Sequence, residues 1–155
     1  MSGSAASATL TYADVAEGTE IAAVTYPVAR LDLVKYCGAS GDFNVIHWNE
    51  RVARSVGLPN VIAHGMYTMA QAGNFVTEWA GGDPGAVTDF GVRFSAMVPV
   101  PDDDTVLAGT AGGATIEVSG KVLEKLQDSK VTVDIVARAD GVKVLTRARA
   151  TVRLP

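Results

Sequence analysis

The sequence of 155 residues has little of several features that define particular protein classes. Its single cysteine, Cys37, cannot form an intramolecular disulfide, which fits a reducing cytoplasm. The net charge is -4 and no long basic block is present, so we expect no nucleic-acid partner. There is no run of about 18 apolar residues that would cross a membrane, and no basic segment followed by an apolar one at the N-terminus. We therefore expect a soluble protein that is not exported.

The composition itself is that of a soluble globular protein, with 48% hydrophobic and 19% charged residues. The length fits one domain that buries its own core. Residues 2–8 are only Ser, Ala and Gly, so we expect residues 1–10 to be a disordered tail or a remnant of cloning. One domain is then expected over residues 11–155, with no internal repeat.

The first half of the chain predicts one strand and two short helices. The strand is expected over residues 21–28, and a helix follows from residue 30 that breaks at Gly38. Residues 49–57 predict the second short helix, with Asn49 as its N-cap.

Residues 64–80 predict the longest helix of the chain. Apolar or small residues cover most of its surface and leave a narrow polar line through Thr68, Gln71, Asn74 and Glu78. A helix that is apolar on most sides is usually buried. At about 1.5 Å per residue it would extend roughly 25 Å, which is long enough for a sheet to wrap around it.

After residues 81–85 the apolar pattern changes from a helical to an alternating period. Asp140-Gly141 is typical of a tight hairpin turn between two strands. The strands expected in this half cover residues 89–98, 106–110, 115–124, 131–138 and 142–152. One strand, then helices, then antiparallel strands predict an α+β fold with the helices on one face of the sheet.

The residues that predict chemistry lie between Tyr36 and His47. Small residues after Tyr36 allow a sharp turn, and Asp42, Asn44 and His47 then place a carboxylate, an amide and an imidazole within six residues. A carboxylate and an imidazole that share one water can perform general acid–base catalysis. Taken alone, Asp42 and Asn44 are better explained as turn residues, and the catalytic interpretation depends on His47 and on the residues from Tyr36 to Gly41 matching together.

Gly65 is a second candidate, because it falls in the first turn of the long predicted helix. Backbone N–H groups there lack intrahelical acceptors and can bind an oxygen that becomes negative during a reaction. That role belongs to the backbone, so close packing also explains the glycine. His64, the competing imidazole, is expected to have a structural role at the helix start, since no carboxylate lies as near to it in sequence.

The pattern resembles the hydratase motif of the (R)-specific enoyl-thioester hydratases and dehydratases, the MaoC-like branch of the hot-dog fold. The matching positions are Tyr36, Gly41, Asp42, Asn44, Ile46, His47 and Ala53. Val45 stands where the family usually has Pro. The resemblance extends through residues 63–66 and 90–94, and it is strongest to the catalytic B-type subunit of the (3R)-hydroxyacyl-carrier-protein dehydratases.

This resemblance implies a single hot-dog fold, in which an antiparallel sheet wraps around a long central helix. It implies reversible hydration of trans-2-enoyl thioesters of CoA or an acyl-carrier protein in fatty-acid metabolism. Asp42 and His47 would act on the water, Asn44 would orient them, and the Gly65 N–H would bind the thioester oxygen. No cofactor or metal is expected. The partner would be a second hot-dog chain, either identical or different.

Several other residues have simpler explanations. Cys37 and Ser40 lie in no nucleophile-elbow pattern and are expected to be packing residues. Residues 102–104, three aspartates, are expected to form a solvated turn rather than a metal site. A basic strand face is either simply exposed or contacts an acidic carrier protein or a CoA phosphate. It comprises Lys143, Arg147, Arg149 and Arg153.

Two alternative functions stay open. The first is a non-catalytic acyl-binding subunit of a heterodimeric dehydratase, which would have no need of Asp42, Asn44 and His47 together. The second is a hot-dog thioesterase, which would release a free thiol, whereas hydration keeps the thioester intact.

Overall fold

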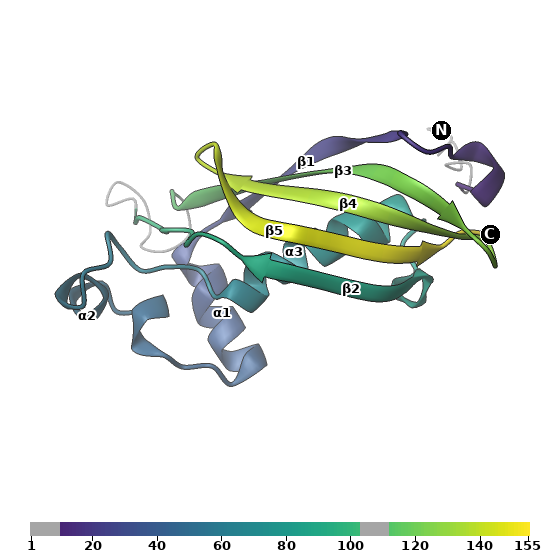
Figure 1. Cartoon of the computed structure of the whole chain (residues 1–155). Coiled ribbons are helices and arrows are strands. Elements are labelled where there is room, and N and C mark those ends of the chain that lie inside the picture. The colour runs from purple at the N-terminus through teal and green to yellow at the C-terminus, as the bar shows by residue number, and fades with distance from the viewer. Residues whose placement is uncertain (1–9, 103–111) are drawn as a thin grey trace, which may run out of the picture.

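A five-stranded antiparallel sheet is the centre of the fold (Figure 1). The computed structural model describes residues 10–102 and 112–155. The strand order is β1-β3-β4-β5-β2, so β1 and β2 form the edges of the sheet. The strands are β1 Glu20–Val28, β2 Val87–Phe94, β3 Ala114–Leu126, β4 Lys130–Ala139 and β5 Val142–Arg153.

Most of the predicted strands are confirmed. Residues 21–28, 115–124, 131–138 and 142–152 fall within β1, β3, β4 and β5. Asp140 and Gly141 have φ angles of 47° and 74°, the positive values that a two-residue hairpin turn requires. The strand expected over residues 106–110 and nearly all of the tail expected over residues 1–10 lie outside the described residues.

The strand predicted over residues 89–98 was placed wrongly at both ends, because β2 spans Val87–Phe94. After β2 the chain leaves the sheet, and residues 98–100 pair with residues 61–63 through backbone hydrogen bonds of 2.8 and 2.9 Å. The two valines in residues 98–100 are buried in this pairing. The apolar alternation therefore continues past the end of the strand, because Val98 and Val100 are buried next to residues 61–63.

The described part of the chain contains the helices α1 Arg30–Ser40, α2 Glu50–Ser55 and α3 Gly65–Trp79. Short 3-10 helices cover Tyr12–Asp14, Val45–His47 and Pro84–Ala86. The predicted N-cap of α2 is confirmed, because the Asn49 side chain accepts the Val52 N–H at 3.1 Å. The 3-10 turn over Val45–His47 was predicted only as loop.

The predicted break of α1 at Gly38 is wrong, because the helix continues to Ser40. It ends at Gly41, which has φ of 75° and donates its N–H to the Cys37 carbonyl at 2.9 Å. Gly41 adopts this left-handed conformation without the steric cost that a Cβ would bring. Asp42 therefore follows directly after the C-cap residue of α1.

The apolar face of α3 also differs from the prediction. A single stripe of the helix is buried, consisting of Thr68, Ala72, Phe75 and Val76. Thr68 was assigned to the polar line, but its hydroxyl donates to the His64 carbonyl at 3.5 Å and is thereby satisfied inside the core. Met66 lies outside this stripe with 56% of its surface exposed. In the single chain, α3 is therefore covered on one side and not on most sides.

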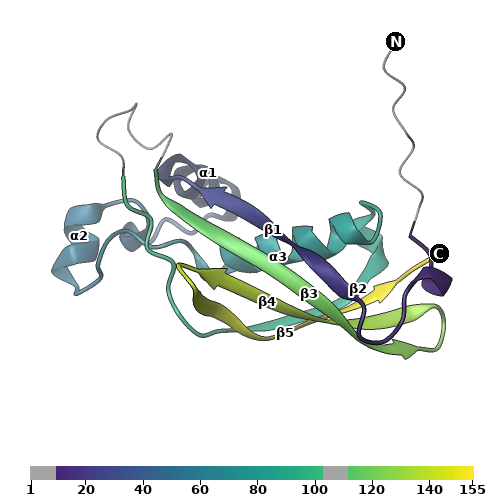
Figure 2. The ribbon, with the colours of Figure 1, turned by 90° about the horizontal axis from the view of Figure 1, so that it is seen from above.

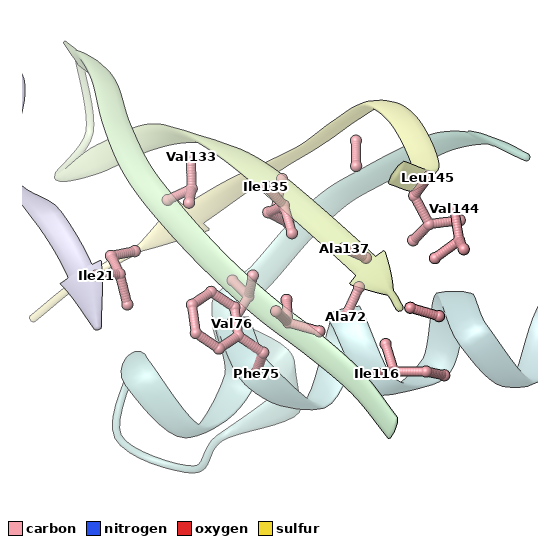
Figure 3. Close-up of a cluster of buried hydrophobic side chains, with 14 of the residues drawn as sticks. Ile21, Ala72, Phe75, Val76, Ile116, Val133, Ile135, Ala137, Val144 and Leu145 are labelled. Atoms are coloured by element: carbon pink, nitrogen blue, oxygen red, sulfur yellow. The ribbon is translucent and has the colours of Figure 1, made fainter. Parts of the chain in front are cut away.

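The hydrophobic core lies between α3 and the inner face of the sheet, and Figure 3 shows Phe75 and Val76 of α3 beside the side chains of β3 and β4. Gly120 of β3 makes this contact possible, because a Cβ there would lie 3.0 Å from the Phe75 ring. The labelled core residues on the strands are Ile21, Ile116, Val133, Ile135, Ala137, Val144 and Leu145.

The elements that carry the candidate residues gather at one end of the sheet. Figures 1 and 2 both place α2 beyond that end and α3 along the face of the sheet. The loop between α1 and α2 therefore lies near the start of α3. Within the described ranges, no helix is both long enough and apolar enough to cross a membrane.

Candidate active site

The loop after α1 is shaped by its own polar side chains. The Asp42 carboxylate accepts the Asn44 N–H at 3.1 Å, and the Asn44 side-chain oxygen accepts the Ile46 N–H at 3.3 Å. These short-range hydrogen bonds are the ones that Asp and Asn favour in turns. Asn44 thereby caps the 3-10 turn Val45–His47, which carries His47 inward to 8% exposure.

The His47 ring is held by a backbone carbonyl. Its Nδ1 lies 2.6 Å from the Ile62 oxygen. A carbonyl only accepts, so Nδ1 carries the proton, and in the neutral ring Nε2 keeps a free lone pair. The second nitrogen, Nε2, points toward Asp42, with 4.0 Å between it and Oδ2.

The two atoms on either side of this gap, His47 Nε2 with its lone pair and an Asp42 carboxylate oxygen, can both accept hydrogen bonds. A distance of 4.0 Å is too long for a direct hydrogen bond but suits a water that donates one hydrogen to each side. The two groups therefore form a site in which both hydrogens of one water are held and its oxygen is left free to attack.

His64 contacts both residues of this pair. Its ring stacks on that of His47, with 3.7 Å between centroids and 22° between planes. Its Nε2 lies 3.1 Å from the Asp42 carbonyl oxygen, to which it donates. Burial lowers the pKa of His64, and the neighbouring His47 lowers it further. His64 is thus held neutral, and its contacts support the structural role expected for it.

Gly65 is the first residue of α3 and, with His47, lines a cavity of about 280 Å³. As the first helical residue, Gly65 has no intrahelical acceptor for its N–H. A Cβ on Gly65 would lie 3.2 Å from the Phe94 ring, so close packing also favours glycine here. The other lining residues are Ile62, Ala63, Thr68, Phe94, Ala96, Met97, Val98 and Val144.

A carboxylate–imidazole pair beside an apolar cavity at a helix start is the arrangement expected from the motif, and comparison with known proteins identifies its family. Residues 13–139 match the family model described as "MaoC like domain". The chain belongs to the MaoC-like domain family. This match covers most of the sequence and includes every residue of the motif.

Solved structures agree with this assignment of the MaoC-like domain. A structure titled "MaoC-like dehydratase" has a TM-score of 0.85 and 40% identity, over 95% of this chain and 43% of that one. The R-hydratase PhaJ1 from Pseudomonas aeruginosa has a TM-score of 0.77 and 25% identity, over 95% of this chain and 86% of that one. The hot-dog fold expected from the sequence is thereby confirmed.

A curated relative is the fatty acid synthase subunit beta of Aspergillus oryzae, 41% identical over 78 residues. The matched segment is 49% of this chain and 4% of that protein. The chain therefore spans only a small part of the length of this relative.

The residues with simpler explanations behave as structural groups. Cys37 is buried, with its Sγ 3.7 Å from His64 Nε2, and burial raises the pKa of its thiol. The Ser40 hydroxyl donates to the Tyr36 carbonyl at 2.7 Å and accepts the Asp42 N–H. Neither is placed as a nucleophile, since a buried neutral thiol and a hydroxyl already used in a turn are poorly reactive.

The charged candidates lie away from the pair. Asp102 lies 3.7 Å from Arg30, and the two aspartates after it fall outside the described residues. The basic residues of β5 are exposed, and Arg149 pairs with Asp134 at 3.6 Å. Contact of this face with a carrier protein or CoA stays a prediction.

One further property of the site concerns metals. Asp42, His47 and His64 each present a ligand atom, and these atoms lie within 4.8 Å of one another. Such residues do bind metals, but His64 Nε2 donates to a carbonyl and the two rings stack nearly parallel. The stacking holds the two imidazoles face to face, whereas ligands of one ion would converge on a common point.

Sequence reasoning missed the Ile62 carbonyl, which sets the protonated nitrogen of His47. Nothing in the identity of Ile62 could have revealed this contact, because any residue supplies a carbonyl. It also missed the stacking of His64 on His47, which depends on how α3 starts beside the loop.

Proposed function

We propose that this MaoC-like domain catalyses the reversible addition of water to a trans-2-enoyl thioester, which forms a (3R)-3-hydroxyacyl thioester. The observation that carries this proposal is the 4.0 Å gap between His47 Nε2 and Asp42 Oδ2, beside an apolar cavity. The R stereochemistry rests on the likeness to the R-hydratase.

In the proposed reaction, Asp42 and His47 hold the water between them. One of the two removes a proton as the water oxygen attacks C3, and that proton is returned to C2 on the same face of the substrate. The pair therefore ends in the protonation state in which it began. Asn44 contributes by fixing the loop, since its side chain caps the turn that carries His47.

The thioester oxygen gains negative charge when C3 is attacked. The Gly65 N–H at the start of α3 is proposed to donate a hydrogen bond to this oxygen, because Gly65 lines the same cavity as His47 and its N–H has no intrahelical acceptor. A preorganised donor of this kind typically contributes about 3 kcal/mol to the stability of the transition state.

The partner is proposed to be a second hot-dog chain, identical or different. Large apolar side chains remain exposed on the site loop and at the cavity, which is typical of a surface that another chain covers. They include Phe43, Trp48, Met66, Phe94 and Met97, which are 46% to 63% exposed.

The decisive assay follows the loss of the conjugated enoyl absorbance when the purified protein meets trans-2-enoyl-CoA. Asp42→Asn and His47→Ala are expected to lower kcat by about 10²- to 10⁴-fold, because each removes one of the groups that move the proton. Asp128→Asn is the matched control, since this exposed carboxylate lies in the turn between β3 and β4. It should leave the rate unchanged.

Near wild-type rates in folded Asp42→Asn and His47→Ala variants would refute the assigned roles. Release of free thiol would identify a thioesterase instead. Loss of activity with a chelator, restored by a divalent metal, would contradict the metal-free reaction. Each arm is repeated with an acyl-carrier-protein substrate and after co-expression with another hot-dog chain.

A further inference from the structure

We propose that Arg30, the first residue of α1, is a positioning residue that fixes the His47 imidazole through the backbone of residues 60–63. This inference rests on the proposed hydratase function. Arg30 is not one of the residues that line the cavity, so it acts on the reaction only through the groups that it holds.

The Arg30 guanidinium connects three segments that are far apart in the sequence. Its Nε donates to the Val100 carbonyl at 3.0 Å, and one terminal nitrogen donates to the side chains of both Glu50 and Asn60. A second terminal nitrogen lies 3.7 Å from Asp102. The side chain is only 16% exposed, so these contacts are formed largely out of water.

Two of these contacts hold the segment behind His47. The Asn60 side chain accepts the Val61 N–H at 2.8 Å, and the Val100 N–H donates to the Val61 carbonyl at 2.8 Å. Arg30 therefore holds both groups that are hydrogen-bonded to Val61, the Asn60 side chain and the Val100 backbone. Hydrogen bonds through Arg30 thereby connect residues 60–63 and 98–100 to the start of α1.

Ile62 passes this constraint to His47 by two hydrogen bonds. Its N–H donates to the Ile46 carbonyl at 3.2 Å, and its carbonyl accepts the proton of His47 Nδ1 at 2.6 Å. Ile62 therefore holds both the backbone before His47 and the ring of His47 by hydrogen bonds. A shift of Ile62 would rotate the imidazole and move Nε2 relative to Asp42.

Glu50 completes the arrangement on the other side of His47. It is the first residue of α2, three positions after His47, and its carboxylate also accepts from Arg54 Nε at 2.7 Å. The hydrogen bonds from Arg30 and Arg54 lower the pKa of Glu50, which keeps it ionised. Through Glu50, Arg30 thus holds the segment that follows the 3-10 turn. Through residues 60–63, it holds the Ile62 carbonyl that orients the His47 ring.

The planar fork of arginine is needed because one group donates to several acceptors in fixed directions. Lysine keeps the charge but is a single point donor. Arg30→Lys should therefore retain the ion pair with Glu50 and lose some of the other hydrogen bonds that Arg30 donates. Arg54→Lys is the matched control, because Arg54 donates to the same carboxylate through its Nε at 2.7 Å.

The test combines kinetics with nitrogen-15 NMR of the imidazoles in the full chain. In Arg30→Lys we expect kcat to fall by about 10²-fold with KM changed little, because the cavity is intact and the reacting groups are displaced. The slowly exchanging His47 Nδ1–H signal should weaken or disappear. Arg54→Lys should retain both the rate and the signal.

A single change could unfold the chain by leaving the charge of Glu50 or Arg30 without its partner. The double variant Arg30→Met/Glu50→Gln removes both charges and keeps the test valid in that case. A folded variant with wild-type kcat and an unchanged His47 signal would overturn the proposal. Loss of the signal in Arg30→Lys supports it even if the wild type hydrates no enoyl thioester. In that outcome only the proposed function fails.

Discussion

At the scale of single residues, the loop that carries Asp42, Asn44 and His47 is shaped by local hydrogen bonds. Asp42 and Asn44 each accept an N–H two residues ahead, so the sequence alone suggests a tight turn that advances His47. The spacing of the three residues could therefore be predicted. The direction of the His47 ring could not, because the carbonyl of Ile62 is 15 residues away.

Val45 provides a prediction at this scale. It is the first residue of the 3-10 turn, a position where proline is well tolerated because its N–H needs no helical partner. The preceding Asn44 has ψ of 124°, which suits a residue before proline. Val45→Pro is therefore expected to keep its hydratase rate within about threefold and to raise stability by about 0.5 kcal/mol.

The enoyl-absorbance assay and urea unfolding of Val45→Pro measure these two quantities. Val56→Pro in the residue after α2 serves as a contrast, since the Val56 N–H donates to α2 carbonyls and would be lost. A sharp fall in activity of Val45→Pro would show that the loop takes another path.

At the scale of elements, the start of α3 combines a buried imidazole with the oxyanion candidate. His64 is the N-cap residue of α3 and is 2% exposed. Its lowered pKa means that the unfolded chain binds a proton more readily than the folded one below pH 6.5. The stability contributed by neutral His64 is therefore complete above pH 6.5 and decreases as the pH falls through its folded pKa.

We expect urea unfolding to show a free energy that declines from pH 7.5 to pH 5.5, by at most about 1.4 kcal/mol per pH unit from this group. His64→Gln should flatten the decline, because the Gln amide can still donate to the Asp42 carbonyl but does not titrate in this range. An equal slope in the wild type and in His64→Gln would contradict this assignment.

The element scale also shows where periodicity misleads. The Gly38 position was read as a helix end, but the end lies at Gly41, where a left-handed residue allows the C-terminal hydrogen bond. In α3, the polar Thr68 is buried because a backbone carbonyl satisfies its hydroxyl. Residue polarity alone could not decide either point, since both depend on which hydrogen bonds the fold supplies.

At the scale of the whole molecule, the exposed apolar residues around the site predict association. If the partner is an identical chain, the wild type will sediment as a dimer, because burial of these side chains contributes about 25 cal/mol per Å² of apolar surface. Met97→Asp should shift it toward the monomer by placing a charge in the contact. Val142→Asp is the control, since Val142 is 56% exposed at the hairpin between β4 and β5.

Analytical ultracentrifugation over a range of concentrations would measure this equilibrium. A wild type that remains monomeric would contradict self-association and direct attention to a different hot-dog chain. A Val142→Asp variant that dissociates as readily as Met97→Asp would place the contact elsewhere on the surface.

The sequence by itself determined the features that depend on near neighbours. The alternating strands β3, β4 and β5, the hairpin turn, the Asn49 cap and the Asp42-to-His47 motif all follow from side chains a few residues apart. Their hydrogen bonds and periods are local, so pattern and residue type suffice.

Only the tertiary structure decided how the site is oriented. The His47 proton position, the stacking of His64 and the contacts of Arg30 all join residues at least 15 positions apart, and the hydrogen bond from Arg30 to Val100 joins residues 70 positions apart. Backbone carbonyls supply several of these contacts, and every residue carries one. Residue identity therefore leaves them undetermined until the chain has folded and brought a particular carbonyl to a particular ring or guanidinium.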